Sequence, residues 1–232
     1  MLADLSPKTL DYLAEIYRLS DHAPLADAGF VSTSALAELL DVSAPAVNRM
    51  VTRLKDLGLL EHEPYHGIRL TPAGTREALK ELRRHRIAEA FLVKVMGFGW
   101  HDVHAEASSI SGALSDTITE RMLEMAGNPT TCPHGEPIPD ADGNLVKPAD
   151  FLLSTAAASE KPYRISRVLT REDDRLEYLA ALGLTPGTEF VLLHVAPFHG
   201  PMQLKVGSEY RIIGHNLAEL IRVVSVDGDS AD

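Results

Sequence analysis

The sequence has little cysteine, few aromatic residues and no excess of positive charge, and these shortages exclude several classes of protein. One cysteine in 232 residues cannot form an internal disulfide, which is typical of proteins in a reducing compartment such as the cytoplasm. Acidic residues outnumber basic ones by 33 to 22, so the formal net charge is −11. This charge excludes a protein that binds nucleic acid over its whole surface, and any such binding must use a local basic patch.

Long apolar runs are also missing from the chain. No run approaches the roughly 20 residues that span a bilayer, and residues 1–19 contain acids where a signal peptide has a basic start and an apolar stretch. The hydrophobic content of 45% is nevertheless enough for two or three small domains with cores of their own. We therefore expect a cytoplasmic protein of several domains.

Residues 34–74 carry the clearest pattern, which is helix, turn, helix and two short strands. Leu36 and Leu40 recur at helical spacing, and residues 41–43 interrupt the first helix. Ser43 is of a type favoured at helix N-caps, and Gly58 is suited to ending the second helix. The apolar stripe of the second helix consists of Val47, Met50, Val51 and Leu54. With strands at 59–61 and 68–71, this is the pattern of a winged helix-turn-helix, whose second helix enters the DNA major groove.

The polar face of that second helix favours DNA binding over an ordinary helical hairpin, which is the structural alternative. Solvated faces usually mix acids and bases, yet residues 43–55 contain no acid although the chain is acidic. Small residues at the helix N-terminus allow close approach to bases and phosphates. The expected base-facing residues are Ser43, Pro45, Ala46, Asn48 and Arg49. The expected phosphate-facing residues are Thr52, Arg53, Lys55, Tyr65 and His66.

Helices dominate the rest of the first 126 residues. The pattern predicts them at 7–19, 75–96, 102–111 and 115–126, with a loop at 21–30. The last two helices carry more apolar surface than they can bury against each other, so we expect a symmetric dimer interface.

The pattern changes in the second half of the chain. Turn-forming residues fill 130–147, which predicts an ordered loop, and residues 151–162 are expected to form a tether, with docking of the apolar start at 151–154 as the alternative. Five short strands and one helix then suggest a small β-barrel. The strands are expected at 164–170, 189–195, 202–206, 209–213 and 221–226, with the helix at 174–182.

Several metal-ligand types occur at spacings that could bring them together. His85 and Glu89 stand four apart on one helix face, and Cys132 and His134 stand two apart on a proline-braced loop. Imidazole, carboxylate and thiolate donors together suit a first-row divalent ion. Further candidates are His104 and Glu106 on the next helix, the acids at 172–174, and Asp11, which shares a face with Glu15. The alternatives are buried or surface histidines, a cysteine that fills apolar space, and a solvated acidic edge.

Four short motifs resemble those of a known family. They are HRIAE at 85–89, VHAEA at 103–107, LSD at 114–116 and CPHGEPIP at 132–139, and they follow the winged helix-turn-helix in order. Together they resemble the DtxR/MntR family of metal-dependent transcriptional repressors over almost the whole chain. The resemblance implies a mainly α protein with a small β component. Its expected parts are a winged helix-turn-helix at 1–75, a helical dimerisation and metal-binding domain at 76–150, a tether at 151–162 and an SH3-like domain of the FeoA type at 163–232.

The resemblance also implies a function. It predicts a homodimer that binds palindromic DNA operators and represses metal-uptake genes when metal is bound. Mn²⁺ is the expected ion, Fe²⁺ is the alternative, and other first-row divalent ions are possible substitutes. The ancillary metal site of the family carries over onto His85, Glu89, His104, Cys132 and His134, with Glu172 contributed by the C-terminal domain.

The primary metal site of the family does not carry over. Asp11 matches its N-terminal ligand, but the next three ligands would fall on Ser108, Ser111 and Gly112, which are weak or lack a side chain. Either Glu106, a serine hydroxyl and water form a weaker site with Asp11, or regulation depends on the site of Cys132 and His134 alone. We favour the second explanation.

Two rival functions differ from a metal-dependent repressor. One is a winged-helix regulator that responds to another ligand or a protein partner, with the metal-type residues only structural. The other is a metallohydrolase using His85, Glu89 and His104. Nothing in the sequence marks a substrate cleft, a glycine-rich phosphate loop or a nucleophile elbow, so we expect no enzyme.

Overall fold

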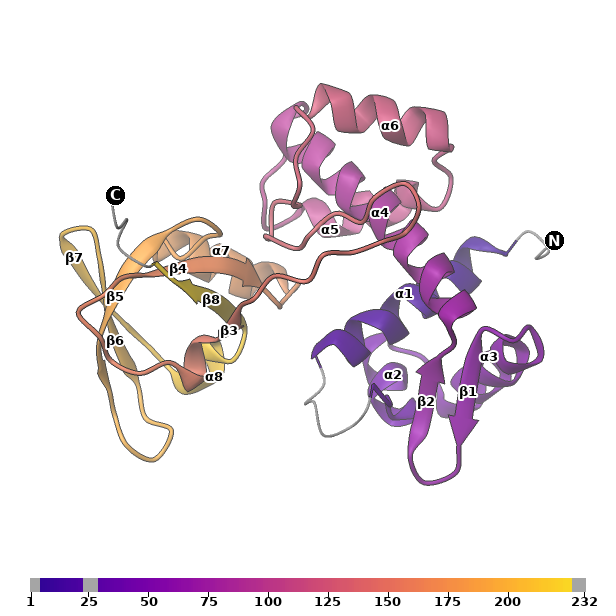
Figure 1. Cartoon of the computed structure of the whole chain (residues 1–232), viewed down its shortest axis with the longest axis horizontal. Coiled ribbons are helices and arrows are strands. Elements are labelled where there is room, and N and C mark those ends of the chain that lie inside the picture. The colour runs from indigo at the N-terminus through magenta and orange to yellow at the C-terminus, as the bar shows by residue number, and fades with distance from the viewer. Residues whose placement is uncertain (1–4, 23–28, 227–232) are drawn as a thin grey trace, which may run out of the picture. The chain divides into compact units, whose positions relative to one another are not determined.

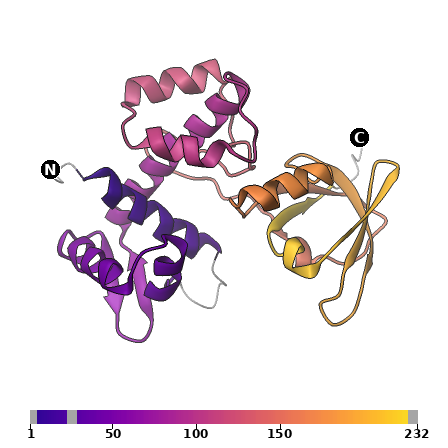
Figure 2. The ribbon, with the colours of Figure 1, turned by 180° about the vertical axis from the view of Figure 1, so that it is seen from behind.

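The structure is a computed structural model that describes residues 5–22 and 29–226 (Figures 1 and 2). The chain divides into two compact units, each assembled from three segments. The first unit contains Met1–His85, Ser108–Thr119 and Pro139–Leu145. The second contains Arg86–Ala107, Glu120–Ile138 and Val146–Asp232. None of the described helices is both long and apolar enough to cross a membrane.

The winged helix-turn-helix predicted from the sequence is confirmed in the first unit. Its elements are α1 (Pro7–His22), α2 (Thr33–Leu39), α3 (Ala44–Asp56), β1 (Leu60–Glu63) and β2 (Gly67–Leu70). The two strands pair antiparallel, with Leu60 opposite Leu70, and form the wing. The apolar stripe of α3 packs into a core that includes Leu13, Ile16, Leu36, Leu54 and Ile68, all fully buried.

The ends of these helices differ in detail from the sequence prediction. Helix α1 continues three residues past the predicted end at 19, because no residue that breaks a helix precedes Pro24. Ser43 occupies the N-cap of α3 as predicted, but its hydroxyl makes no capping hydrogen bond. Ser32 does cap its helix, since its hydroxyl accepts from the Ala35 amide at 3.0 Å.

Three helices link the winged helix to the rest of the chain. They are α4 (Pro72–Lys94), α5 (Val103–Ser111) and α6 (Asp116–Met125). Helix α4 begins three residues before the predicted position, because Pro72 suits a first helical turn. The Thr71 hydroxyl accepts from the Gly74 amide at 3.1 Å and fixes this start. The segment after α6 is an ordered loop, as predicted, with an isolated bridge between Thr131 and Pro137.

A six-stranded antiparallel sheet and two helices occupy residues 151–225 of the second unit, which we call the sheet domain. The elements are β3 (Phe151–Leu152), a 3₁₀ turn (Leu153–Thr155), β4 (Tyr163–Val168), α7 (Asp173–Ala181), β5 (Glu189–Val195), β6 (Met202–Val206), β7 (Glu209–Ile213), α8 (His215–Ala218) and β8 (Ile221–Ser225). The strand order is β3-β8-β4-β5-β6-β7, and bulges in β4 and β5 help it to curve. All five strands predicted from the sequence are present.

The segment expected to be a tether begins instead inside this sheet. Phe151 pairs with Val223, and Leu153 is fully buried in the core of the sheet domain. A strand of two residues is too short to show the alternation from which strands are recognised in a sequence. The same limit explains why the four-residue helix α8 was not predicted.

Gly74 provides a test of the packing between α4 and the wing. A Cβ atom at this position would lie 1.9 Å from the carbonyl oxygen of Leu59, which is backbone and cannot move aside cheaply. We expect Gly74→Ala to lower the stability by roughly 1–3 kcal/mol, as overpacking does. Helix propensity alone predicts that the substitution raises the stability, because alanine is more favourable in a helix than glycine. Thermal unfolding followed by circular dichroism measures the change, with the exposed Lys80→Ala on the same helix as control. A more stable Gly74→Ala protein would contradict the close approach.

Candidate metal centre

Five potential metal ligands form two overlapping groups that share Glu89. Within each group the ligand atoms all lie within 4.8 Å of one another. His85, Glu89 and His104 make one group, and Glu89, Cys132 and His134 make the other. We call these five residues the ligand cluster. They are five of the eight metal residues predicted from the sequence.

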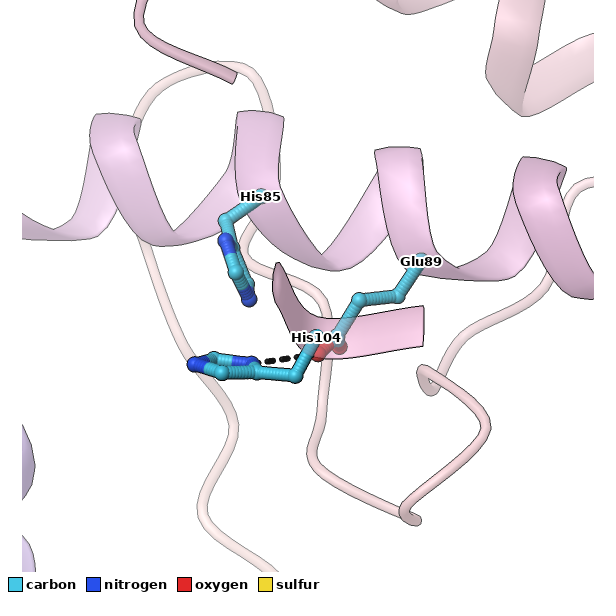
Figure 3. A group of neighbouring side chains, drawn as sticks. All are labelled: His85, Glu89 and His104. Atoms are coloured by element: carbon cyan, nitrogen blue, oxygen red, sulfur yellow. Dashed lines mark hydrogen bonds and ion pairs between the residues drawn. The ribbon is translucent and has the colours of Figure 1, made fainter. Parts of the chain in front are cut away.

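Helix α4 presents two of the ligands on one face. His85 and Glu89 are one turn apart and both project toward His104 on α5 (Figure 3). Both side chains are buried, and Glu89 is only 3% exposed. The Glu89 Oε1 atom lies 3.1 Å from His104 Nδ1 and 3.5 Å from His134 Nδ1. One buried carboxylate therefore lies between two imidazole rings.

The Cys-Pro-His-Gly loop presents the other two ligands. The Cys132 amide donates to the Glu136 carbonyl, and the Gly135 amide donates to the Cys132 carbonyl, both at 2.9 Å. Gly135 adopts a φ of +84°, and a Cβ atom there would lie 2.1 Å from the Ser166 carbonyl oxygen in β4. Only glycine fits this approach, so the loop is held against the sheet while Cys132 Sγ and His134 Nδ1 lie 3.9 Å apart.

A backbone carbonyl sets the orientation of the His134 ring. His134 Nε2 donates to the carbonyl oxygen of Trp100 at 2.7 Å, which leaves Nδ1 facing Glu89 and Cys132. Metal-binding histidines are commonly fixed in this way through their second nitrogen. Burial is the largest single influence on this ring and favours its neutral form. The hydrogen bond and charge of Glu89, with the Trp100 carbonyl, outweigh burial and raise the pKa of His134.

The thiol of Cys132 is also held in its protonated form. Burial raises the pKa of Cys132 well above its ordinary value, and the negative charge of Glu89 adds to this effect. Metals bind the thiolate, so a cation that binds here must displace the thiol proton.

A chain of ion pairs surrounds the loop and was missed in the sequence analysis. Arg86 donates to the Pro137 carbonyl at 2.6 Å and pairs with Glu136 at 3.0 Å. Glu136 also pairs with Arg167 at 3.2 Å, and the fully buried carboxylate of Asp150 accepts from Arg167 at 2.9 Å and from Arg222 at 2.5 Å. Arg86 and Glu136 lie within the HRIAE and CPHGEPIP motifs, so these two motifs contain residues that position the loop as well as metal ligands.

Three other predicted metal residues, Asp11, Glu106 and Glu172, belong to neither group of ligand atoms. Glu106 is exposed on α5. Glu172 is the exposed N-cap residue of α7 and pairs with Arg175 at 2.8 Å. Its neighbour Arg171 donates to His104 Nε2 at 3.1 Å, a contact that the sequence did not predict.

Asp11 lies in a pocket of about 210 Å³ within the first unit, and His85 of the ligand cluster is one of the residues that line this pocket. Its lining includes Glu15, Glu81, Ser108 and Ser111, but not Glu106. The Ser111 hydroxyl donates to Glu81 at 2.9 Å. Burial, followed by the charges of Glu81 and Glu15, raises the pKa of Asp11.

Arginines already pair with the carboxylates of this pocket. Arg84 pairs with Glu81 at 2.6 Å, and Arg18 pairs with Glu15. No local sequence pattern marks Glu81, because its pairing with Ser111 joins positions thirty residues apart.

Nine of the ten residues predicted to contact DNA are exposed, and the tenth, Ala46, is half-buried. The members on α3 lie opposite its buried residues Val47, Val51 and Leu54. Tyr65 and His66 lie at the tip of the wing between β1 and β2. The exposed surface of α3 is therefore compatible with a nucleic-acid interface.

Three parts of the chain match known families. Residues 4–68 match the iron dependent repressor N-terminal DNA binding domain, and residues 71–140 match the iron dependent repressor metal binding and dimerisation domain. Residues 153–225 match the FeoA domain.

Individual relatives match over nearly the whole chain. The iron-dependent repressor IdeR of Mycobacterium tuberculosis is 30% identical over 96% of this chain and 99% of its own. A solved manganese-dependent transcriptional repressor in complex with manganese superposes with a TM-score of 0.86, at 31% identity, covering 94% of this chain and 100% of that one. IdeR of T. acidophilum superposes with a TM-score of 0.80, at 32% identity, covering 94% and 97%.

Proton displacement makes metal affinity depend on pH. The raised pKa values of Cys132 and His134 mean that both groups hold protons which a metal must displace. We therefore expect the affinity for Mn²⁺ to rise from about pH 6 to about pH 8, with proton release on binding. Calorimetry in two buffers of different ionisation enthalpy measures the released protons. Cys132→Ser should release fewer protons, and a pH-independent affinity would contradict metal binding by these two groups.

Proposed function

Because this chain belongs to the DtxR/MntR family of metal-dependent transcriptional repressors, we propose that its ligand cluster is the metal site that controls DNA binding. The protein is a metal-dependent DNA-binding transcription regulator and not an enzyme. It has a DNA-binding domain, a dimerisation domain and a FeoA domain. Our proposals concern the site, the ion and the way in which the chain uses them.

The observation that carries the proposal is the position of Glu89 between the rings of His104 and His134. The donors of the ligand cluster come from α4, α5 and the loop after α6. Their chemistry, with imidazole, carboxylate and one thiol, fits a first-row divalent cation. A divalent cation would supply the positive charge that a buried carboxylate and thiolate need.

We propose Mn²⁺ as the ion, with Fe²⁺ as the alternative. Relatives described as manganese-dependent and as iron-dependent support both, and related structures hold Zn²⁺ and Cd²⁺. The thiolate of Cys132 softens the donor set, which reduces the selectivity for manganese. Affinity alone therefore cannot select the ion, and the metal available in the cell contributes to the choice.

We propose that the Asp11 pocket holds no regulatory metal. Glu81 already binds Ser111 and Arg84, and Glu15 already binds Arg18. These arginines supply positive charge to the acids of the pocket, and the serine hydroxyls are weak ligands. The remaining metal-type donors of the pocket are Asp11 and His85, and His85 already belongs to the ligand cluster, so we propose that regulation depends on the ligand cluster alone.

The regulator is proposed to act as a cytoplasmic homodimer on palindromic operators of metal-uptake genes. Ile118 and Met125 on α6 are about half exposed, which supports the predicted dimer surface. Metal controls DNA binding only if it binds more tightly to the arrangement that fits the operator.

Operator binding should respond to metal through Glu89 and not through Ser111. On a duplex selected from random sequence, we expect retention with Mn²⁺, loss with a chelator and recovery when Mn²⁺ is restored. Glu89→Gln should abolish this response, because it removes the charge shared by both ligand groups. Ser111→Ala is the matched control for the pocket and should respond as the wild type does. Unchanged binding after chelation would favour a regulator that responds to another ligand.

Two arginines of α3 should contribute differently to DNA binding. Arg53→Ala should weaken binding to all sequences equally and reduce the salt slope by about one, as loss of a phosphate contact does. Arg49→Ala should cost about 1–3 kcal/mol on the selected operator and relax its specificity. Fluorescence anisotropy at several salt concentrations, on operator and scrambled duplexes, separates the two effects. Equal losses from Arg49→Ala on both duplexes would remove Arg49 from base recognition.

A further inference from the structure

Arg171 contacts the ligand cluster from the sheet domain. It lies between β4 and α7, and its guanidinium donates to His104 Nε2 at 3.1 Å. His104 and Arg171 belong to the same compact unit. An arginine side chain can only donate hydrogen bonds, so His104 Nε2 must be the acceptor. The other ring nitrogen, Nδ1, then carries the proton and donates to Glu89 Oε1 at 3.1 Å.

This arrangement uses the single acceptor nitrogen of a neutral imidazole. A metal ion needs the same lone pair. If the ion binds Nε2, it takes the position of the Arg171 donor. If the ion binds Nδ1, the proton of the neutral ring moves to Nε2. The Nε2–H group and the Arg171 guanidinium are then both donors and cannot form a hydrogen bond with each other. In both cases the hydrogen bond between Arg171 and His104 is lost.

The backbone around Arg171 is fixed on both sides. The Val168 amide donates to the carbonyl of His134 at 2.9 Å, and the Leu169 amide donates to the carbonyl of Leu220 at 2.8 Å. The buried Thr170 accepts from the Glu172 amide through its hydroxyl at 3.2 Å. The fold of the sheet domain therefore positions the Arg171 guanidinium next to His104. Its positive charge also reaches His134, where it opposes the rise in pKa caused by Glu89.

We propose that Arg171 is an internal competitor for the metal. Its guanidinium occupies His104 until a divalent cation displaces it, so metal binding and this contact with the sheet domain exclude each other. The proposal rests on the proposed function of the ligand cluster as the metal site. The family resemblance implies that this domain lends a carboxylate, Glu172, which would strengthen metal binding. Arg171 has the opposite charge, so it raises the metal concentration at which the site fills.

The proposal predicts that loss of Arg171 tightens metal binding. Couplings between two sites are typically about 5- to 150-fold, and we expect Arg171→Ala to lower the Kd for Mn²⁺ by a factor in this range. Titration calorimetry on the full chain at one pH measures the change. Arg175→Ala is the matched control, because Arg175 pairs with the exposed Glu172 nearby and should leave the Kd unchanged.

A double-variant comparison shows whether the effect passes through His104. In a His104→Ala background the blocked nitrogen is absent, so Arg171→Ala should no longer tighten binding. Nitrogen NMR of the metal-free protein gives a readout that does not involve metal. The His104 ring should be protonated at Nδ1 in the wild type, and its Nε2 signal should move in Arg171→Ala. If that variant does not fold, Arg171→Met keeps the apolar stem of the side chain and removes both the charge and the donor.

Failure of this proposal is distinguishable from failure of the proposed function. If the wild type does not bind Mn²⁺, or if Glu89→Gln binds it equally well, the ligand cluster is not the metal site and both proposals fall. If Glu89→Gln loses binding but the Kd of a folded Arg171 variant is unchanged or higher, only the competitor is overturned. If Arg171→Ala lowers the Kd equally in the wild-type and His104→Ala backgrounds, Arg171 acts only through its charge. That result would also overturn the proposed competition for His104.

Discussion

The shared carboxylate of Glu89 is the interaction on which the site depends. It is almost completely buried and contacts rings that come from α5 and from the loop after α6. A buried carboxylate is strongly unfavourable unless positive charge or hydrogen bonds compensate it. The hydrogen bond and charge of Glu89 raise the pKa of His134 and so favour the positively charged form of that ring beside the carboxylate. The same requirement makes the position favourable for a divalent cation.

The loop that completes the site depends on the sheet domain for its shape. Gly135 packs against the backbone of β4, and Glu136 joins Arg86 of α4 to Arg167 of β4. Asp150 extends this chain of charges to Arg222 in β8. Buried ion pairs contribute little net stability, but removing one partner leaves an uncompensated charge. These contacts therefore specify one arrangement of the loop, and the FeoA domain is part of the structure that holds the ligands in place.

The sequence predicted the parts of the site that depend on local spacing. The pair of His85 and Glu89 follows from helical periodicity, and the pair of Cys132 and His134 follows from a short loop braced by prolines. Contacts between distant positions could not be predicted in this way, because no local pattern records them. Arg171 with His104 and Ser111 with Glu81 are of this kind. The strands of the sheet were predicted by alternation, whereas β3 is too short to alternate.

The acids of the Asp11 pocket and the one acid of the ligand cluster, Glu89, are compensated in different ways. In the Asp11 pocket, arginines from the same helices as the acids pair with Glu15 and Glu81 one turn away, so positive charge is permanently present. In the ligand cluster, Glu89 contacts the rings of His104 and His134 and raises the pKa of His134, while the guanidinium of Arg171 contacts His104 from the sheet domain. Protons and a side chain on a separate element can be displaced, whereas a neighbouring residue on the same helix remains at high local concentration. Exchange of positive charge is therefore easier at the ligand cluster, and this difference favours it as the place where the protein senses a metal ion.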